Sequence, residues 1–169
     1  EAWKRGQKIA ELNIQIEKSE NDLVFTRAKL LNQIKEQELI AKNTTLSDKE
    51  RLAATDEAAR LTKKLADEER AILEMKIEKL SLDQQSNDTS RSEYKELQQL
   101  RADLIAKDTE AKAIELKFLG AKNAIIKKSR QDQLNASKKA IDNALKESKV
   151  ALDLYIAEQG VKSKTLKEE

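Results

Sequence analysis

The sequence predicts an all-α protein, built as an elongated antiparallel helical hairpin or coiled coil. Three observations predict this class. The 169 residues include no proline and three glycines, so little interrupts a helix. Charged residues make up 38% of the chain and aromatic residues 3%, a composition typical of long helices and poor for a globular core. Apolar residues recur every three to four positions, which favours helix over disorder.

The first helix is expected over residues 2–42. Its apolar residues fall three, four or seven positions apart, so they form a stripe on one face of the helix. The helix is expected to end before Asn43-Thr44-Thr45, because these residue types favour caps and turns. The residues of the stripe are Ile9, Leu12, Ile16, Leu23, Leu30 and Ile34.

The second helix is expected over residues 48–84, opened by a capping box at Ser47 and Glu50. In such a box the serine hydroxyl accepts from the glutamate N–H, and the carboxylate accepts from the serine N–H. Glu68 and Lys79 interrupt the heptad seam, which suits a helical hairpin better than a symmetric zipper. The apolar residues of the seam are Ala58, Leu61, Leu65, Ile72, Met75 and Leu82.

The third helix is expected over residues 91–160. The pattern at Ser90 and Glu93 repeats the capping box and predicts where this helix begins. Gly160 precedes a polar tail and is expected to mark fraying or a helix end. The expected starts of the second and third helices therefore share the capping-box pattern and use neither proline nor glycine.

The apolar register changes within this third helix. One register runs over residues 97–125 and another over 134–155, and the two are out of phase by one residue, so a break in register is expected near 126–133. The chain then has three long helices, or four if the break interrupts the helix. We favour a continuous helix, because no glycine, proline or turn cluster lies there. The part beyond residue 130 is expected to overhang the hairpin, which favours self-association through the helical seams.

The residue types argue against an enzyme. Histidine and cysteine are absent, so the commonest general base and the usual soft metal ligands are missing. The adjacent acids Glu68-Glu69 and Glu168-Glu169 do not face each other on a helix, and we interpret them as solvated. We predict no catalytic residue, cofactor site, metal site or small-molecule substrate.

Charge and hydropathy restrict the partners. The net charge of +2 argues against a dedicated nucleic-acid or membrane-surface binder. The densest basic stretch, Lys127-Lys128-Ser129-Arg130 with Lys138-Lys139, has no interleaved aromatic residues for base stacking, and we interpret it as a polar helix side. No apolar run reaches the about 18 residues that span a bilayer. Because the chain begins with Glu1, it is expected to be part of a longer polypeptide.

Residues 11–124 carry a family resemblance. A helix ending "ELIAKNTT" is followed by the cap "LSDKE", the Ala-rich helix start "RLAATDEAARLTKKLADEE" and a second cap region "SNDTSRSEYKEL". This pattern resembles the helical central regions of tail tape measure proteins from phages and prophages of Bacteroides-type bacteria. The resemblance covers about two thirds of the chain.

The resemblance implies an elongated helical protein that fills the lumen of the phage tail tube and whose length sets the tail length. Its partners would be its own copies, the tail tube protein and tail assembly chaperones. Its location would be the virion tail, or the bacterial cytoplasm during assembly. Two alternatives stay open. One is a coiled-coil arm of a chromosome-organising ATPase-like scaffold, and the other is a helical-bundle protein-binding domain.

Overall fold

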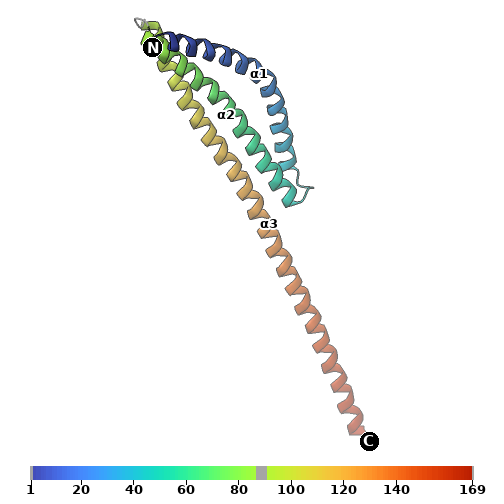
Figure 1. The fold of residues 1–169 in the computed structure, drawn as a ribbon. Coiled ribbons are helices and arrows are strands. Elements are labelled where there is room, and N and C mark those ends of the chain that lie inside the picture. Colours follow the sequence, from blue (N-terminus) through green and yellow to red (C-terminus); the bar gives the residue numbers. More distant parts are fainter. Residues whose placement is uncertain (1, 87–90, 169) are drawn as a thin grey trace. The chain divides into compact units, whose positions relative to one another are not determined.

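Apart from the turn at residues 43–47, the described part of the chain is helical. A computed structural model describes residues 2–86 and 91–168, which form three α-helices and no strand. These are α1 (Ala2–Lys42), α2 (Asp48–Ser86) and α3 (Arg91–Glu168) (Figure 1). The predicted all-α class and the count of three helices are confirmed.

The helix bounds differ from the expected ones at two C-terminal ends. α2 continues to Ser86 instead of residue 84, and α3 continues to Glu168 instead of residue 160. Gly160 does not adopt the positive φ of a helix C-cap, since no described glycine has one. A glycine costs about 1 kcal/mol relative to alanine inside a helix, which the neighbouring helix formers can offset.

The chain divides into two compact units, Glu1–Ile125 and Ile126–Glu169, where the sequence predicts a single segment. The boundary falls at the start of the stretch 126–133, in which the break in register is expected. α3 remains helical through this stretch, because a change of apolar register alters which face packs without removing any backbone hydrogen bond.

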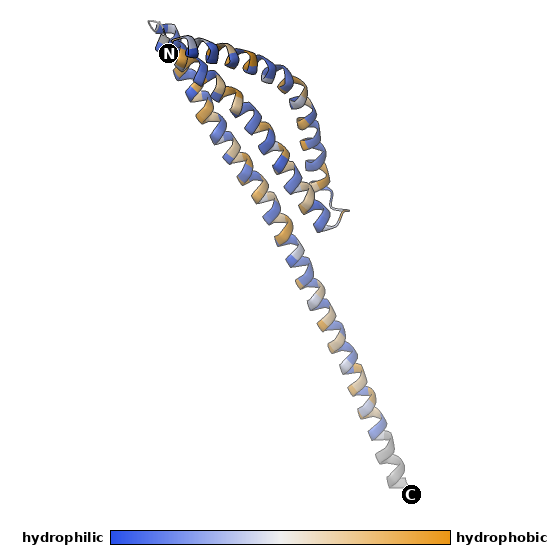
Figure 2. Ribbon diagram, in the orientation of Figure 1, coloured by the Kyte–Doolittle hydropathy of each residue, from blue (hydrophilic) through white to orange (hydrophobic). Residues whose placement is uncertain are grey.

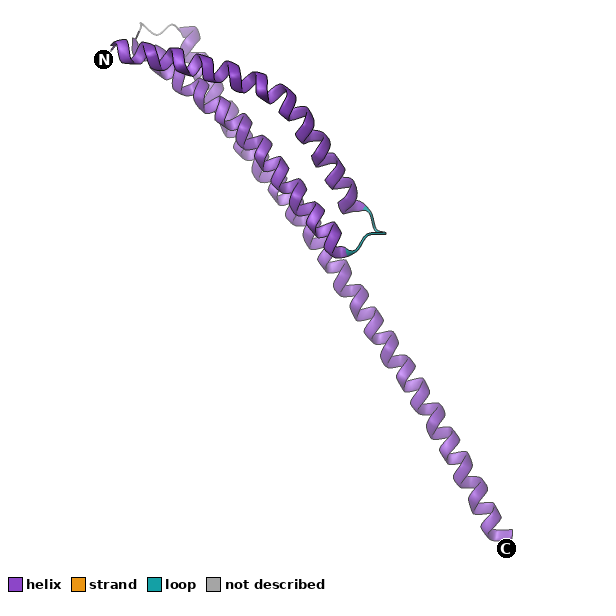
Figure 3. Ribbon diagram, turned by 45° about the vertical axis from the view of Figure 1, so that its right-hand side comes forward, coloured by secondary structure: helices purple, strands orange, loops and turns teal. Residues whose placement is uncertain are grey.

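Within the first unit, α1 and α2 form an antiparallel hairpin joined by a short loop (Figures 1 and 3). Ion pairs connect the beginning of α1 with the end of α2, and the middle of each helix with the middle of the other. These pairs are Lys8–Glu78, Glu20–Lys76 and Arg27–Glu69.

The core of the first unit is thin and mostly aliphatic. One cluster joins Leu30 of α1 with Leu61 and Leu65 of α2. Figure 2 shows apolar residues recurring among polar ones along each helix instead of collecting in one mass. The buried apolar residues are Leu12, Ile16, Leu30, Ala54, Ala58, Leu61, Leu65, Ile72, Leu97, Phe118 and Ile125.

Candidate interaction surfaces

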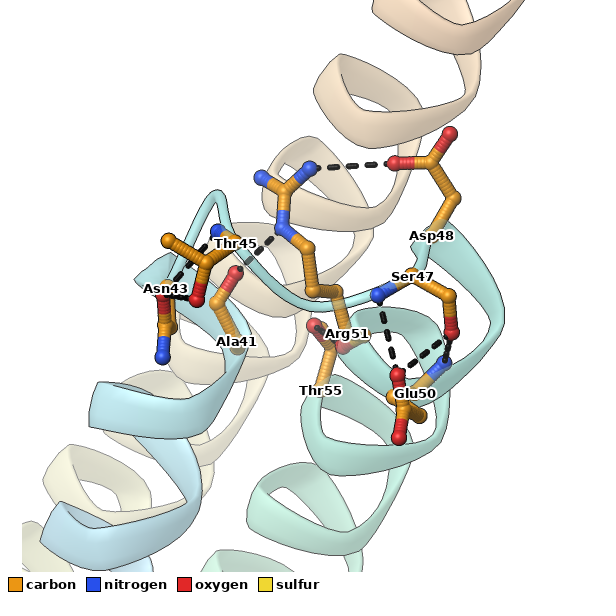
Figure 4. Close-up of polar contacts among 8 residues, drawn as sticks. All are labelled: Ala41, Asn43, Thr45, Ser47, Asp48, Glu50, Arg51 and Thr55. Atoms are coloured by element: carbon orange, nitrogen blue, oxygen red, sulfur yellow. Dashed lines mark hydrogen bonds and ion pairs between the residues drawn. The ribbon is translucent and has the colours of Figure 1, made fainter.

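The turn between α1 and α2 contains both bonds of a capping box (Figure 4). The Ser47 N–H donates to Glu50 Oε2 over 2.9 Å, and the Glu50 N–H donates to Ser47 Oγ over 3.3 Å. The Ser47 hydroxyl also donates to Glu50 Oε2 over 2.6 Å. The box satisfies two N–H groups that the helix itself leaves without partners.

These bonds change the titration of Glu50. The hydrogen bond from the Ser47 hydroxyl, followed by that from its N–H, lowers the pKa of Glu50 below its ordinary value. A carboxylate with a lowered pKa stabilises the fold above its unfolded pKa. This stabilisation is therefore lost on the acid side, as pH falls below about 4.3 and through the lowered pKa.

Replacing Ser47 by alanine is expected to destabilise the hairpin by about 1 kcal/mol at neutral pH, the usual effect of losing a helix cap. The same change should raise the pKa of Glu50, because its main stabilising hydrogen bond is lost. NMR titration of the Glu50 carboxyl and urea unfolding would measure the two effects. Thr44→Ala, at an exposed position of the same turn, is the control. An unchanged Glu50 pKa in S47A would contradict the prediction.

Arg51 ties the two helices together at this turn. Its Nε donates to the Ala41 carbonyl near the end of α1 over 3.1 Å, and its NH1 contacts Asp48 Oδ1 over 3.1 Å (Figure 4). The side chain is 12% exposed. Thr55, 2% exposed, donates to the Arg51 carbonyl over 2.8 Å. The sequence predicts no such role for Arg51, because its acceptor belongs to another helix.

The loop itself is an Asx turn. Asn43 Oδ1 accepts from the Thr45 N–H over 3.0 Å and from the Thr45 hydroxyl over 2.7 Å. The Leu46 N–H donates to the Asn43 carbonyl over 3.3 Å. Asparagine side chains favour this local bonding over continued helix. The break between α1 and α2 is therefore stabilised by the Asx turn that follows α1 and by the capping box that opens α2.

The structure describes only part of the second predicted cap, since Ser90 lies outside the described residues. Glu93 belongs to the first turn of α3, and its carbonyl accepts from Gln84 Nε2 over 3.2 Å. Arg5 NH1 donates to the Gln85 carbonyl over 2.9 Å. The end of α2 thus contacts both the start of α3 and the start of α1.

Glu69 of α2 joins all three helices. It forms ion pairs with Arg27 NH1 of α1 at 3.5 Å and with Lys107 Nζ of α3 at 2.7 Å, and its side chain is 13% exposed. α1 bows away from α2 midway along its length (Figures 1 and 3), and these three residues with Leu23 line a hollow of about 360 Å³ there. The prediction of a solvated Glu68-Glu69 pair is wrong for Glu69.

The Glu69 contact changes the titration of Lys107. Hydrogen bonds to Glu69 first and to Glu110 second raise the pKa of Lys107. A raised lysine pKa contributes stability that is complete below the unfolded value of about 10.4. That contribution disappears as pH rises through the raised pKa. The tie is therefore intact throughout the physiological range.

Replacing Glu69 by glutamine is expected to loosen α3 from the hairpin. The loss should be about 0.5–1 kcal/mol, as for a partly exposed ion pair, and should shrink at high salt. Hydrogen exchange of the amides in residues 91–125 would measure it. Glu68→Gln is the matched control, because Glu68 contacts Lys64 of its own helix at 4.0 Å. Equal effects of the two changes would contradict a special role for Glu69.

Further ion pairs place α3 along the hairpin within the first unit. Lys117 Nζ lies 2.8 Å from Glu38 Oε1 of α1, and Lys122 Nζ lies 2.9 Å from Asp56 Oδ1 of α2. Between α2 and α3 lies a groove of about 560 Å³. Small or apolar residues and charged residues of both signs line it. The small or apolar ones are Ala59, Thr62, Ala66, Ala111, Ile114 and Phe118.

These surfaces are suited to contacts between helices. Among the described residues, no three carboxylates, histidines or cysteines gather closely enough to hold a metal ion. Within the described ranges, no helix is both long and apolar enough to cross a bilayer. Comparisons with protein-family models, with curated proteins and with solved structures found no significant match.

The second unit carries a different surface. Over residues 130–159 of α3, every side chain is exposed in the single chain. This includes the apolar residues of the register over 134–155, for example Leu134 at 52% and Leu145 at 63% exposure. The basic residues Lys127, Lys128 and Arg130 are also exposed. The helix thus displays an uncovered apolar stripe beside a basic stretch.

Proposed function

We propose that this chain is a structural, non-enzymatic helical segment that acts through contacts between helices, specifically as part of a phage tail tape measure protein. In this role it is an elongated coiled coil that fills the tail tube and helps to set the tail length. Its partners are copies of itself, the tail tube protein and tail assembly chaperones. It resides in the virion tail, or in the bacterial cytoplasm during assembly.

One observation carries the structural role. α3 presents large apolar side chains that stay exposed over residues 130–159, and such a surface marks a site of contact with another protein. Two features support it further. The chain lacks histidine and cysteine, and its first unit is held by a thin aliphatic core and by ion pairs between helices. The specific assignment to a tail tape measure protein rests on the residue pattern of 11–124.

Two experiments test the assignment to a tail. Genes for tube, baseplate or other tail proteins should lie beside the gene for this chain, and their absence would remove the proposal. Duplicating residues 134–154 in frame adds three heptads and so preserves the register. Tails in electron micrographs should then lengthen by about 30 Å if the added residues are helical. Asn143→Asp, with no change in length, is the control. Tails of unchanged length with the duplication would refute the role.

A second candidate, a helical-bundle protein-binding domain, is favoured by the groove between α2 and α3. Its lining includes the small residues Ala59, Ala66 and Ala111, which suit the close approach of another helix. Solution scattering separates the two candidates. A compact monomer with a radius of gyration of about 15 Å, the value for a globule of this length, would favour the binding domain. A much larger radius would favour the elongated structural role.

A further inference from the structure

The second unit exposes many large apolar side chains to water. Eight large apolar residues between 126 and 160 are exposed by half or more. Packing against a partner usually supplies most of the stability of a helix in a protein. These residues are Leu134, Ile141, Leu145, Val150, Leu152, Leu154, Tyr155 and Ile156.

Part of this surface forms a heptad seam. The positions alternate by four and three residues over three heptads, which is the 3.5-residue repeat of a coiled coil. Two polar residues, Lys138 and Ser148, interrupt it. The seam is Leu134, Lys138, Ile141, Leu145, Ser148, Leu152 and Tyr155.

The charges along the unit are divided into two halves of opposite sign. Residues 126–139 contain five basic side chains and one acidic one, whereas residues 140–160 contain four acidic side chains and two basic ones. A parallel pair of copies would place the basic halves side by side. An antiparallel pair places each basic half against the acidic half of the other copy, which lowers the electrostatic energy.

We propose that residues 126–160 pair with the same residues of a second copy of this chain as an antiparallel two-stranded coiled coil. The apolar positions select the register. With Leu134 opposite Leu152 of the second copy, Ile141 lies opposite Leu145, and the two-fold symmetry repeats both layers. Four apolar layers result, which is the largest number that we find for an antiparallel alignment of this seam.

The polar positions agree with this register. Lys138 and Ser148, the interruptions of the seam, lie opposite each other, so neither faces a leucine or isoleucine. Arg130 and Glu158 occupy flanking positions on the same side of the pair and can form an ion pair in each half. One contact in this register is unfavourable. Asp142 lies close to Asp142 of the second copy at the centre of the pair, with Lys146 one turn away.

The pairing uses the self-association in the proposed function but not its location in a phage tail. If the chain were absent from phage tails, the proposed pairing would still stand. If the chain did not self-associate, it could still be detected in phage tails. Sedimentation equilibrium of the full chain should show a monomer–dimer equilibrium. A monomer at all concentrations up to about 100 µM, or a trimer, would overturn the proposal.

Cysteine cross-linking tests the orientation, and the absence of natural cysteines makes each introduced thiol unique. Under mild oxidation, a mixture of Leu134→Cys and Leu152→Cys chains should form the mixed disulfide dimer in preference to either homodimer. In a parallel pair each variant would instead cross-link with itself. Preferential self-linking of L134C would overturn the antiparallel arrangement.

Two further variants test the seam and the register. Leu145→Asp should weaken dimerisation at least 100-fold, whereas Asn143→Asp, on the opposite side of the helix, should leave it within about twofold. Asp142→Asn should strengthen dimerisation about two- to fivefold by removing the central repulsion. In a register shifted by one heptad, Asp142 would face Lys149, and D142N would weaken the dimer. That result would overturn the register proposed here.

Discussion

Replacing Leu12 by alanine is expected to lower the free energy of unfolding of the first unit by about 3 kcal/mol. Leu12 is 1% exposed, the most enclosed large side chain described. The change removes three carbon atoms from the core and leaves a cavity that a thin core fills poorly. Hydrogen exchange of amides in residues 2–86 under increasing urea would measure the loss in this unit separately from the second.

Ile14 provides the control for this prediction. It lies two residues further along α1 and is 68% exposed, so Ile14→Ala should change stability by about 0.5 kcal/mol or less. Helix propensity works in favour of alanine at both positions. Equal losses for the two substitutions would mean that α1 does not bury the face assigned to it.

Replacing Ala58 by leucine is expected to destabilise the hairpin by about 1–3 kcal/mol. Ala58 is fully buried, at 0% exposure, and Ala54 one turn earlier is 4% exposed. Small side chains at both positions let neighbouring elements approach α2 closely. A larger side chain must displace them or adopt a strained rotamer. Urea denaturation followed by the same hydrogen-exchange measurement would show the loss.

Ala53→Leu is the matched control for this change, since Ala53 is an exposed alanine of the same helix. It should alter stability by about 0.5 kcal/mol or less. A stabilising effect of leucine at position 58 would show that the core around Ala58 is loosely packed. The assignment of positions 54 and 58 to a tight contact would then be wrong.

The helix starts and the buried stripes could be predicted, because they depend on neighbours in sequence. A cap at Ser47 requires only Glu50, three residues later, and both bonds of the box are present. A buried face requires only apolar residues at helical spacing, and Leu12, Leu30 and Leu65 are buried as that spacing implies. The polar stretch after residue 160 misled the prediction, since helix continues to Glu168.

The pairing of charges could not be predicted in the same way. The spacing of Asp56 and Arg60 favours an ion pair within α2, yet Asp56 contacts Lys122 of α3 and Arg60 contacts Glu57. The sequence around Glu69 predicts a solvated side chain, but side chains of α1 and α3 cover it. A long charged side chain reaches several partners of similar energy, and the helices that pack nearby select among them.

The sequence by itself determined that this protein is helical, where its second helix begins and most of the apolar residues that form the buried faces of its first two helices. These properties arise from backbone hydrogen bonds, caps and apolar spacing within a few residues. Only the tertiary structure decided that Arg51 closes the first turn and that Glu69 joins three helices. Those outcomes depend on residues that are distant in sequence and meet only after the helices pack, so no local pattern encodes them.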